Sequence, residues 1–112
     1  GTARRILCGE HLLRFVAELI RATDPNDAEA GESTRGNVRF GASPRAAQAI
    51  VLGAKVRALL DARPVVEKRD IEACALAALR HRVQLSFEAT AEDRRVEELL
   101  PEWLDLARRR AK

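Results

Sequence analysis

The sequence lacks several residue types, and each absence excludes a class of protein. Among its 112 residues there is no Met and no Tyr, and the aromatic residues are three Phe and one Trp. The core must therefore be built from Leu, Val, Ile and Ala, a composition that favours helices. No apolar run approaches the ~20 residues of a membrane-spanning helix, and the N-terminus has no signal-peptide pattern. We expect a soluble protein located in the cytoplasm.

Cysteine and histidine are equally scarce, which argues against a disulfide framework and against a metal centre. Cys8 and Cys74 are the only cysteines, and neither belongs to a paired motif. His11 and His81 are isolated from each other, and no cluster of Cys, Asp or Glu at ligand spacing accompanies them. These features fit a reduced, intracellular compartment and predict no metal site.

The charge balance gives little support for nucleic-acid binding. Twenty basic residues face 17 acidic ones, for a net charge of +3, and both signs are interspersed except at the C-terminus. Such a small excess differs from the basic stripes of nucleic-acid proteins. The length is that of one domain, which we take to span residues 1–112.

Apolar residues recur at helical spacing along most of the chain and predict an all-α fold, a small bundle of about four helices joined by short extended links. The expected helices are 10–23, 43–62, 67–82 and a last one beginning after Thr90 and Asp93, which have capping-box spacing. Residues 1–9 are expected to be a flexible extension, 24–37 a mobile loop and 101–112 a C-terminal extension beyond a kink at Pro101. Val83, Leu85 and Phe87 alternate with polar residues and predict a short extended segment.

The second of these helices is apolar over more than half of its circumference. Ala47, Ile50, Val51, Ala54 and Ala58 form one stripe, and Leu52, Val56, Leu59 and Leu60 form a second beside it. A helix of this kind is expected to lie at the centre of its domain.

The start of that helix is the most informative feature of the sequence. In Gly41-Ala42-Ser43-Pro44-Arg45-Ala46, Ser43 is a strong N-cap candidate and Pro44 suits the first helical position. Arg45 then stands at the second position, and its side chain is expected to lean back past the helix end. A guanidinium beside a positive helix terminus favours an anion, and phosphate matches its geometry. We therefore predict a phosphate site formed by Ser43, Pro44 and Arg45.

Several stretches of the sequence together resemble the C-terminal helical lid domain of the MoxR family of AAA+ ATPases. They are residues 38–46 (VRFGASPRA), 54–61 (AKVRALLD), 66–71 (VEKRDI), 79–83 (LRHRV) and 87–89 (FEA). The resemblance covers roughly residues 10 to 100, and it departs from the family in two places. Glu67-Lys68 replaces the usual Thr-Pro start of a helix, which weakens the expected cap, and the 24–37 loop is unusually long.

The resemblance implies a role for Arg45 and a set of partners. Arg45 occupies the position of the sensor 2 arginine, which senses the γ-phosphate of ATP bound to the P-loop core. It also implies ATP and Mg in the full-length protein, packing against the protein's own N-terminal core, neighbouring subunits of a homo-oligomeric ring, most simply a hexamer, and chaperone-like work on protein clients.

The chain itself has no catalytic core. Its three lysines, Lys55, Lys68 and Lys112, follow no glycine, so there is no GxxxxGK(S/T) motif, and no apolar run ends in paired acids. We expect that it neither binds nor hydrolyses ATP unaided. We further expect it to be an isolated C-terminal fragment, with Gly1-Thr2 left from its cloning.

Two other functions compete with the lid. A long apolar helix, a Val-Val link and a helix with an early acid also resemble half of a histone fold, a dimerising DNA-binding module. Its phosphate contacts would be a small set of basic residues at both termini, namely Arg4, Arg5, Arg108, Arg109, Arg110 and Lys112. A helical adaptor with an exposed apolar groove is compatible with the lid. Trp103 and Leu104 are candidates for that contact, although core packing is the simpler use of a lone Trp. His81, between Arg80 and Arg82, could serve as a second phosphate sensor or an intersubunit contact, but a helix C-terminus with basic residues in its last turn explains all three residues more simply.

Overall fold

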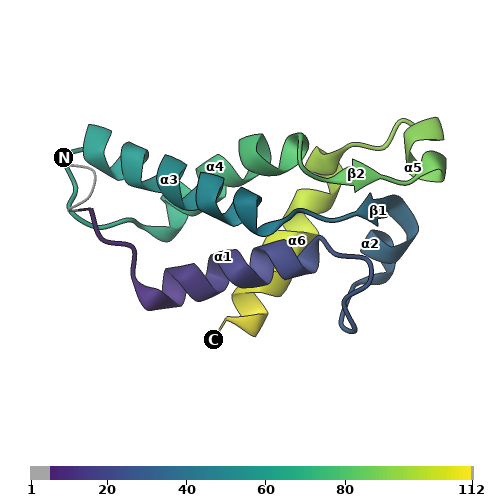
Figure 1. Ribbon diagram of the computed structural model, residues 1–112, viewed down its shortest axis with the longest axis horizontal. Helices are drawn as coiled ribbons and strands as arrows, with labels where there is room; N and C mark the ends of the chain where they lie inside the picture. Colours follow the sequence, from purple (N-terminus) through teal and green to yellow (C-terminus); the bar gives the residue numbers. More distant parts are fainter. Residues whose placement is uncertain (1–5, 112) are drawn as a thin grey trace.

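A computed structural model describes residues 6–111 and confirms the all-α fold (Figure 1). Four longer helices form the bundle: α1 (Glu10–Ala22), α3 (Pro44–Leu60), α4 (Lys68–Arg80) and α6 (Val96–Arg110). Two short helices, α2 (Glu32–Asn37) and α5 (Phe87–Ala91), and two short strands, β1 (Val38–Phe40) and β2 (Gln84–Leu85), complete this part of the chain. The domain measures 45 × 26 × 19 Å.

Helices α1, α3 and α4 run side by side along the longest dimension, whereas α6 crosses behind α1 (Figure 1). The two strands pair antiparallel, with Val38 opposite Leu85, and lie with α2 and α5 at one end of the molecule. Contacts between α1 and α6, between α1 and α3 and between α3 and α4 enclose one hydrophobic core. Its fully or almost fully buried side chains include Phe15, Val16, Leu19, Ile50, Ala54, Ile71, Ala75, Leu79 and Trp103.

The segment predicted as a 24–37 loop is partly helical, which corrects the prediction. Residues 32–37 form α2, and the preceding turn is held on α6, where Arg110 donates a hydrogen bond to the carbonyl of Glu29. Thr34 of α2 is fully buried. The sequence of α2 has no apolar periodicity because a single polar side chain, rather than an apolar stripe, anchors it to the bundle.

Neither predicted extension is separate from the bundle where the structure describes it. Ile6 is buried, and Leu7 pairs with Val65 in a parallel bridge, so this segment lies alongside the extended Val65-Val66 link. Residues 1–5 of the predicted N-terminal extension, with Gly1-Thr2 among them, lie outside the described residues. At the other end, Trp103 and Ala107 are fully buried in α6, so residues 101–111 belong to the bundle.

A break or a kink is expected at Pro101, but helix α6 runs through this residue without a break. Val96, Leu99, Trp103 and Ala107 lie buried on one face of the helix, while Pro101 is exposed. The apolar contacts of that face hold the turns on both sides of the proline in one helix. Tertiary packing thus outweighs the local cost of a mid-helix proline, about 3 kcal/mol.

The predicted capping box at Thr90 and Asp93 is wrong. Thr90 lies inside α5, and Asp93 has a left-handed backbone with φ of 59°. Its N–H donates to the carbonyl of Thr90 at 3.0 Å, and the N–H of Arg94 donates to that of Ala89 at 2.9 Å, which together end α5 in a Schellman motif. Asp tolerates this conformation better than most residues. Helix α6 therefore begins only at Val96, after Arg95.

The extended segment predicted to reach Phe87 ends at Leu85. The hydroxyl of Ser86 accepts a hydrogen bond from the N–H of Ala89 at 3.1 Å and begins α5, so Phe87 is helical. Its side chain is 84% exposed. The extended segment ends before Phe87 because Ser86 acts as the N-cap of α5.

Candidate functional site

The start of α3 has the capped geometry that the sequence predicts. Ser43 has extended backbone angles, Pro44 is the first helical residue, and the Ser43 hydroxyl accepts a hydrogen bond from the N–H of Arg45 at 3.3 Å. The N–H of Ala46 donates to the Ser43 carbonyl at 2.9 Å. Since Pro44 has no N–H, these bonds occupy the first backbone donors of the helix. An anion at this end would therefore be held mainly by the side chain of Arg45.

The guanidinium of Arg45 is available for such a contact. The residue is exposed, and the first turn of α3 contains no acidic residue. Among residues 6–111, no carboxylate forms an ion pair with it, whereas most other arginines of α3, α4 and α6 are paired. The sequence therefore places one uncompensated positive charge where the helix dipole also favours an anion.

The turn that leads into α3 lies directly on the end of α1. A Cβ atom on Gly41 would stand 2.7 Å from the carbonyl oxygen of Thr23 and 2.8 Å from Cα of Asp24, a distance that no backbone neighbour tolerates. The N–H of Ala42 donates to the hydroxyl of Thr23 at 2.9 Å, and that hydroxyl donates to the carbonyl of Ile20 at 2.7 Å. Gly41 is recognisable in the sequence motif, but Thr23 is not, because a threonine at a helix end carries no signal of a partner 19 residues away.

Only one of the two apolar stripes of α3 is buried. Ala46, Ile50, Ala54 and Ala58 have no exposed surface, but Leu52, Val56 and Leu60 are 62%, 41% and 82% exposed. Helix α3 is central, as expected, in that it packs against both α1 and α4, but these helices cover only one of its sides and leave the other open. We call the exposed side chains Leu52, Val56 and Leu60, with the neighbouring Leu13 of α1, the outer apolar face.

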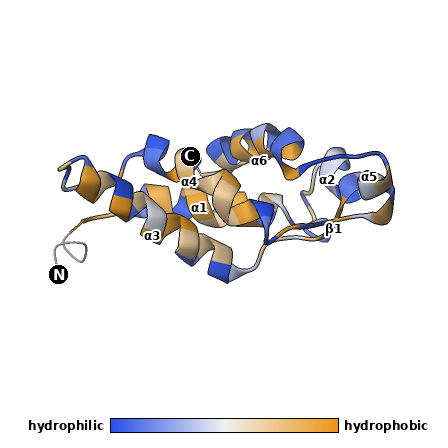
Figure 2. Cartoon of the chain, turned by 90° about the horizontal axis from the view of Figure 1, so that it is seen from above, coloured by the Kyte–Doolittle hydropathy of each residue, from blue (hydrophilic) through white to orange (hydrophobic). Residues whose placement is uncertain are grey.

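A groove of about 420 Å³ lies between α1 and α3, where Leu13 and Leu52 of this face form part of its lining. It is lined by Leu13, Val16, Ala17, Ala47, Gln48, Val51, Leu52 and Lys55. Viewed from above, hydrophobic segments of α1 and α3 lie next to each other (Figure 2). Leu52 follows Arg45 by seven residues, about two helical turns, so both lie on the same side of α3. The exposed guanidinium and the exposed apolar residues therefore face the same direction.

Trp103 and Leu104, the predicted contact residues of an adaptor, do not form such a face. Trp103 is fully buried, and its indole N–H donates to the hydroxyl of Thr34 at 2.8 Å. Leu104 is half-buried and packs against the core. A lone tryptophan at helical spacing proves to be a core residue here.

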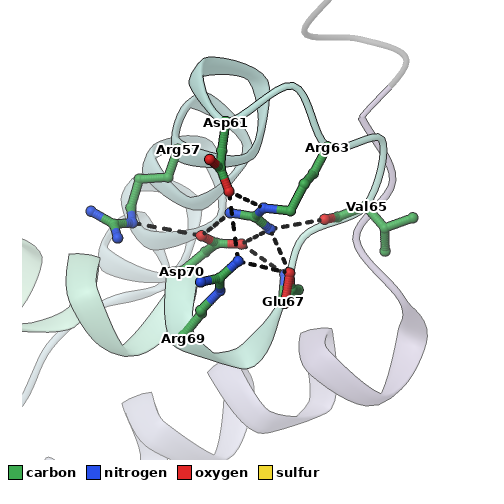
Figure 3. Close-up of polar contacts among 7 residues, drawn as sticks. All are labelled: Arg57, Asp61, Arg63, Val65, Glu67, Arg69 and Asp70. Carbon is green, nitrogen blue, oxygen red and sulfur yellow. Dashed lines mark hydrogen bonds and ion pairs between the residues drawn. The ribbon is translucent and has the colours of Figure 1, made fainter.

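Polar contacts around Asp70 join the end of α3 to the start of α4 (Figure 3). The carboxylate of Asp70 is fully buried and accepts two hydrogen bonds from the Arg63 guanidinium, at 2.8 and 2.9 Å, and one from the N–H of Glu67 at 2.8 Å. Arg63 lowers the pKa of Asp70 to about 2. Because Asp70 caps the helix from its third residue, it compensates for the absence of the family's Thr-Pro start.

The remaining sequence candidates have structural roles. Arg82 donates to the carbonyl of Ala78 in the last turn of α4 at 3.1 Å, and His81 is the exposed residue that ends this helix. This arrangement favours the helix-terminus interpretation over a phosphate contact. In the C-terminal tail, Arg108 pairs with Glu72, Arg109 with Asp105 and Arg110 with Glu29. Arg4, Arg5 and Lys112 lie outside the described residues.

Between residues 6 and 111, no three residues of the types His, Cys, Asp and Glu are grouped so that they could hold a metal ion. Both Cys8 and Cys74 are free, and burial raises the pKa of each thiol. In the same part of the chain, no helix is both long enough and apolar enough to cross a membrane.

Comparison with known proteins decides the family. A family model of the AAA lid domain matches residues 32–103, from α2 into α6, and therefore includes Arg45. The chain belongs to the AAA lid domain family. Chaperone MoxR1 of Mycobacterium tuberculosis is 32% identical over 82 residues, which are 73% of this chain and 22% of that protein. This AAA lid is thus of the MoxR type, as the sequence motifs indicated.

A solved structure supports the same assignment for the fold. The 2.00 Å crystal structure of a candidate ATPase from Cytophaga hutchinsonii ATCC 33406 superposes with a TM-score of 0.87 and is 29% identical. The match covers 93% of this chain and 32% of that protein. The AAA lid described here therefore spans between a fifth and a third of the length of these two relatives.

Proposed function

We propose that this domain is the sensor 2 lid of a MoxR-type AAA+ ATPase, in which Arg45 contacts the γ-phosphate of ATP bound to a P-loop core. The observation that carries the proposal is the exposed, uncompensated guanidinium at the capped start of α3. A phosphate fits this group because two parallel N–H···O bonds of a guanidinium match its oxygens.

In the proposed mechanism, Arg45 stabilises negative charge on the γ-phosphate while the phosphoryl group is transferred to water. Ser43 and Pro44 contribute by fixing where α3 begins, and hence where the guanidinium projects. Loss of the γ-phosphate after hydrolysis removes the partner of Arg45. The lid is then free to rotate relative to the core, which is the motion that would drive work on a client.

The proposal extends to the partners of the domain. ATP and Mg would be held by the P-loop core, whose residues supply the metal and phosphate chemistry. The outer apolar face is a suitable contact for that core or for a neighbouring subunit, since exposed apolar surface next to a functional charge is typical of interaction sites. A hexameric ring in the cytoplasm that remodels or matures client proteins in a chaperone-like manner completes the proposal.

The histone-like alternative is not favoured. Half of a histone fold needs a second chain to cover its long helix, but the buried stripe of α3 is already covered by α1 and α4 of the same chain. The three arginines of the tail that the structure describes are paired with carboxylates, so their charge is already balanced.

Substitution of Arg45 in the full-length ATPase tests the proposal. Arg45→Ala should lower ATP turnover by about a hundredfold, the size of effect seen when a single transition-state donor is lost. The variant domain should remain folded because the side chain is exposed. Arg109→Ala, which removes another exposed arginine at the far end of α6, is the matched control and should retain turnover. Wild-type turnover in the Arg45→Ala protein would remove Arg45 from the mechanism.

A further inference from the structure

The hydroxyl of Thr23 links the end of α1 to the residues that precede Arg45. Thr23 ends α1 and is fully buried. Its hydroxyl hydrogen is directed at the carbonyl of Ile20, at 2.7 Å, which leaves the lone pairs of the oxygen to accept the N–H of Ala42 at 2.9 Å. One side chain thus satisfies a helix-end carbonyl and an N–H that lies just outside α3.

The same contact leaves little freedom to the turn between β1 and α3. Gly41 packs on the backbone of Thr23 and Asp24 with no space for a Cβ atom. On the other side of the turn, β1 is paired with β2, where Phe40 lies opposite Gln84. The segment Gly41-Ala42 is therefore held between α1 and the strand pair, and Arg45 follows three residues after Ala42.

Helix α1 supplies a rigid reference for this turn. It packs along α6 and against α3, and its residues Phe15, Val16 and Leu19 are buried in the core. The hydrogen bond from the N–H of Ala42 to the hydroxyl of Thr23 connects the turn before Ser43 to the end of α1. That bond is therefore one of the contacts that define where α3 begins, and with it where the Arg45 guanidinium lies.

We propose that Thr23 is a positioning residue for Arg45: its hydroxyl fixes the start of α3 relative to α1 so that the guanidinium reaches the phosphate. The inference rests on the proposed sensor 2 function. Thr23 touches neither nucleotide nor metal in this scheme and acts only through Arg45. Because catalytic groups lose much of their effect when displaced by about 1 Å, loss of the bond should lower turnover while the domain stays folded.

The test uses the full-length ATPase with two substitutions at one position. Thr23→Val keeps the shape of the side chain but removes both hydrogen bonds, and it should lower kcat about tenfold. Thr23→Ser keeps the hydroxyl and should restore kcat to within about twofold of wild type. Asp70→Asn, which weakens a buried ion pair at the opposite end of α3, is the control for general destabilisation and should affect kcat much less.

A double substitution separates positioning from a purely structural effect. In an Arg45→Ala background, Thr23→Val should cause no further loss of turnover, since Thr23 acts through the missing guanidinium. An additional loss in that background, or an equal loss in Asp70→Asn, overturns the inference while the sensor 2 function stands. Wild-type turnover in Arg45→Ala alone instead overturns the sensor 2 function and the role of Thr23 with it.

A measurement on the 112-residue chain covers the case in which the Thr23→Val ATPase assembles poorly. Amide hydrogen exchange of Ala42 should be slow in the wild type and in Thr23→Ser, and at least tenfold faster in Thr23→Val. Unchanged protection of Ala42 in the valine variant would show that the hydroxyl does not hold this turn, and the inference would fail.

Discussion

The indole N–H of Trp103 donates a hydrogen bond of 2.8 Å to the hydroxyl of Thr34, although 69 residues separate them in the sequence. Both side chains are fully buried. Through this bond, α6 holds α2, a helix of six residues with little apolar surface of its own. The contact explains how a polar segment between α1 and β1 becomes part of the bundle.

Thr34→Val should destabilise the domain by about 1–3 kcal/mol, because it leaves the buried indole N–H without an acceptor. Denaturation by urea, followed by circular dichroism, measures this loss. Trp103→Phe is a poor comparison because it also removes packing volume. In a Trp103→Phe background, however, Thr34→Val should cost much less, and an equal cost in both backgrounds would show that the hydrogen bond is not the source.

Asp70 gives the stability of the domain a defined dependence on pH. Its pKa is about 2 in the folded chain against an ordinary value of 3.8, so the unfolded state binds protons first as the solution is acidified. The ionised carboxylate therefore contributes stability above about pH 4, and this contribution of about 2 kcal/mol is lost as the pH falls towards 2.

Asp70→Asn should accordingly cost about 3 kcal/mol at pH 7, where the buried Arg63 contact loses its charged partner. The difference in unfolding free energy between the wild type and Asp70→Asn should shrink between pH 4.5 and pH 2.5. Urea titrations of both proteins at pH 7, 4.5 and 2.5 measure this difference in unfolding free energy. A difference that stays constant over this range would mean that the charge of Asp70 does not stabilise the fold.

Two glycines should respond to alanine in opposite directions. At Gly41 the new Cβ would collide with the backbone of Thr23 and Asp24, so Gly41→Ala should destabilise the domain by more than about 1 kcal/mol and displace the start of α3. At Gly36, inside α2, a Cβ meets nothing within 4 Å, and Gly36→Ala should stabilise by about 0.5–1 kcal/mol. Thermal unfolding of the two variants under one condition decides between these expectations. Equal melting temperatures would contradict the collision at Gly41.

The outer apolar face should matter for assembly and not for folding. Leu52→Ser removes a side chain that is 62% exposed and should change the unfolding free energy by less than about 0.5 kcal/mol. Ile50→Ala, two residues away but fully buried, should cost about 2–5 kcal/mol. In the full-length ATPase, Leu52→Ser should weaken ring formation in analytical ultracentrifugation. Normal rings in Leu52→Ser would assign another surface to the contact with the core or the neighbouring subunit.

Local signals in the sequence were sufficient for the four long helices. The apolar spacing of Leu12, Phe15 and Leu19, and the Ser43-Pro44 start, each depend on neighbours within one or two turns. The structure has the first three of these helices within about two residues of the predicted bounds, whereas α6 begins several residues later than predicted. The predictions that failed were made from local sequence rules at positions where contacts with residues elsewhere in the chain determine the structure. Pro101 stays helical because Trp103 and Leu99 pack on the core, and Asp93 leaves the predicted cap because it ends α5.

The features of the candidate site likewise fall into those that the sequence predicts and those that only the tertiary structure shows. The sequence by itself determined the helix cap at Ser43, the place of Arg45 beside it and the likeness to a MoxR-type lid, since all three reside in contiguous residues. Only the tertiary structure decided which stripe of α3 is covered, that Trp103 belongs to the core, and that Thr23 holds Ala42. Those features depend on side chains brought together from separate helices, where burial and hydrogen bonding act over distances that no periodicity records.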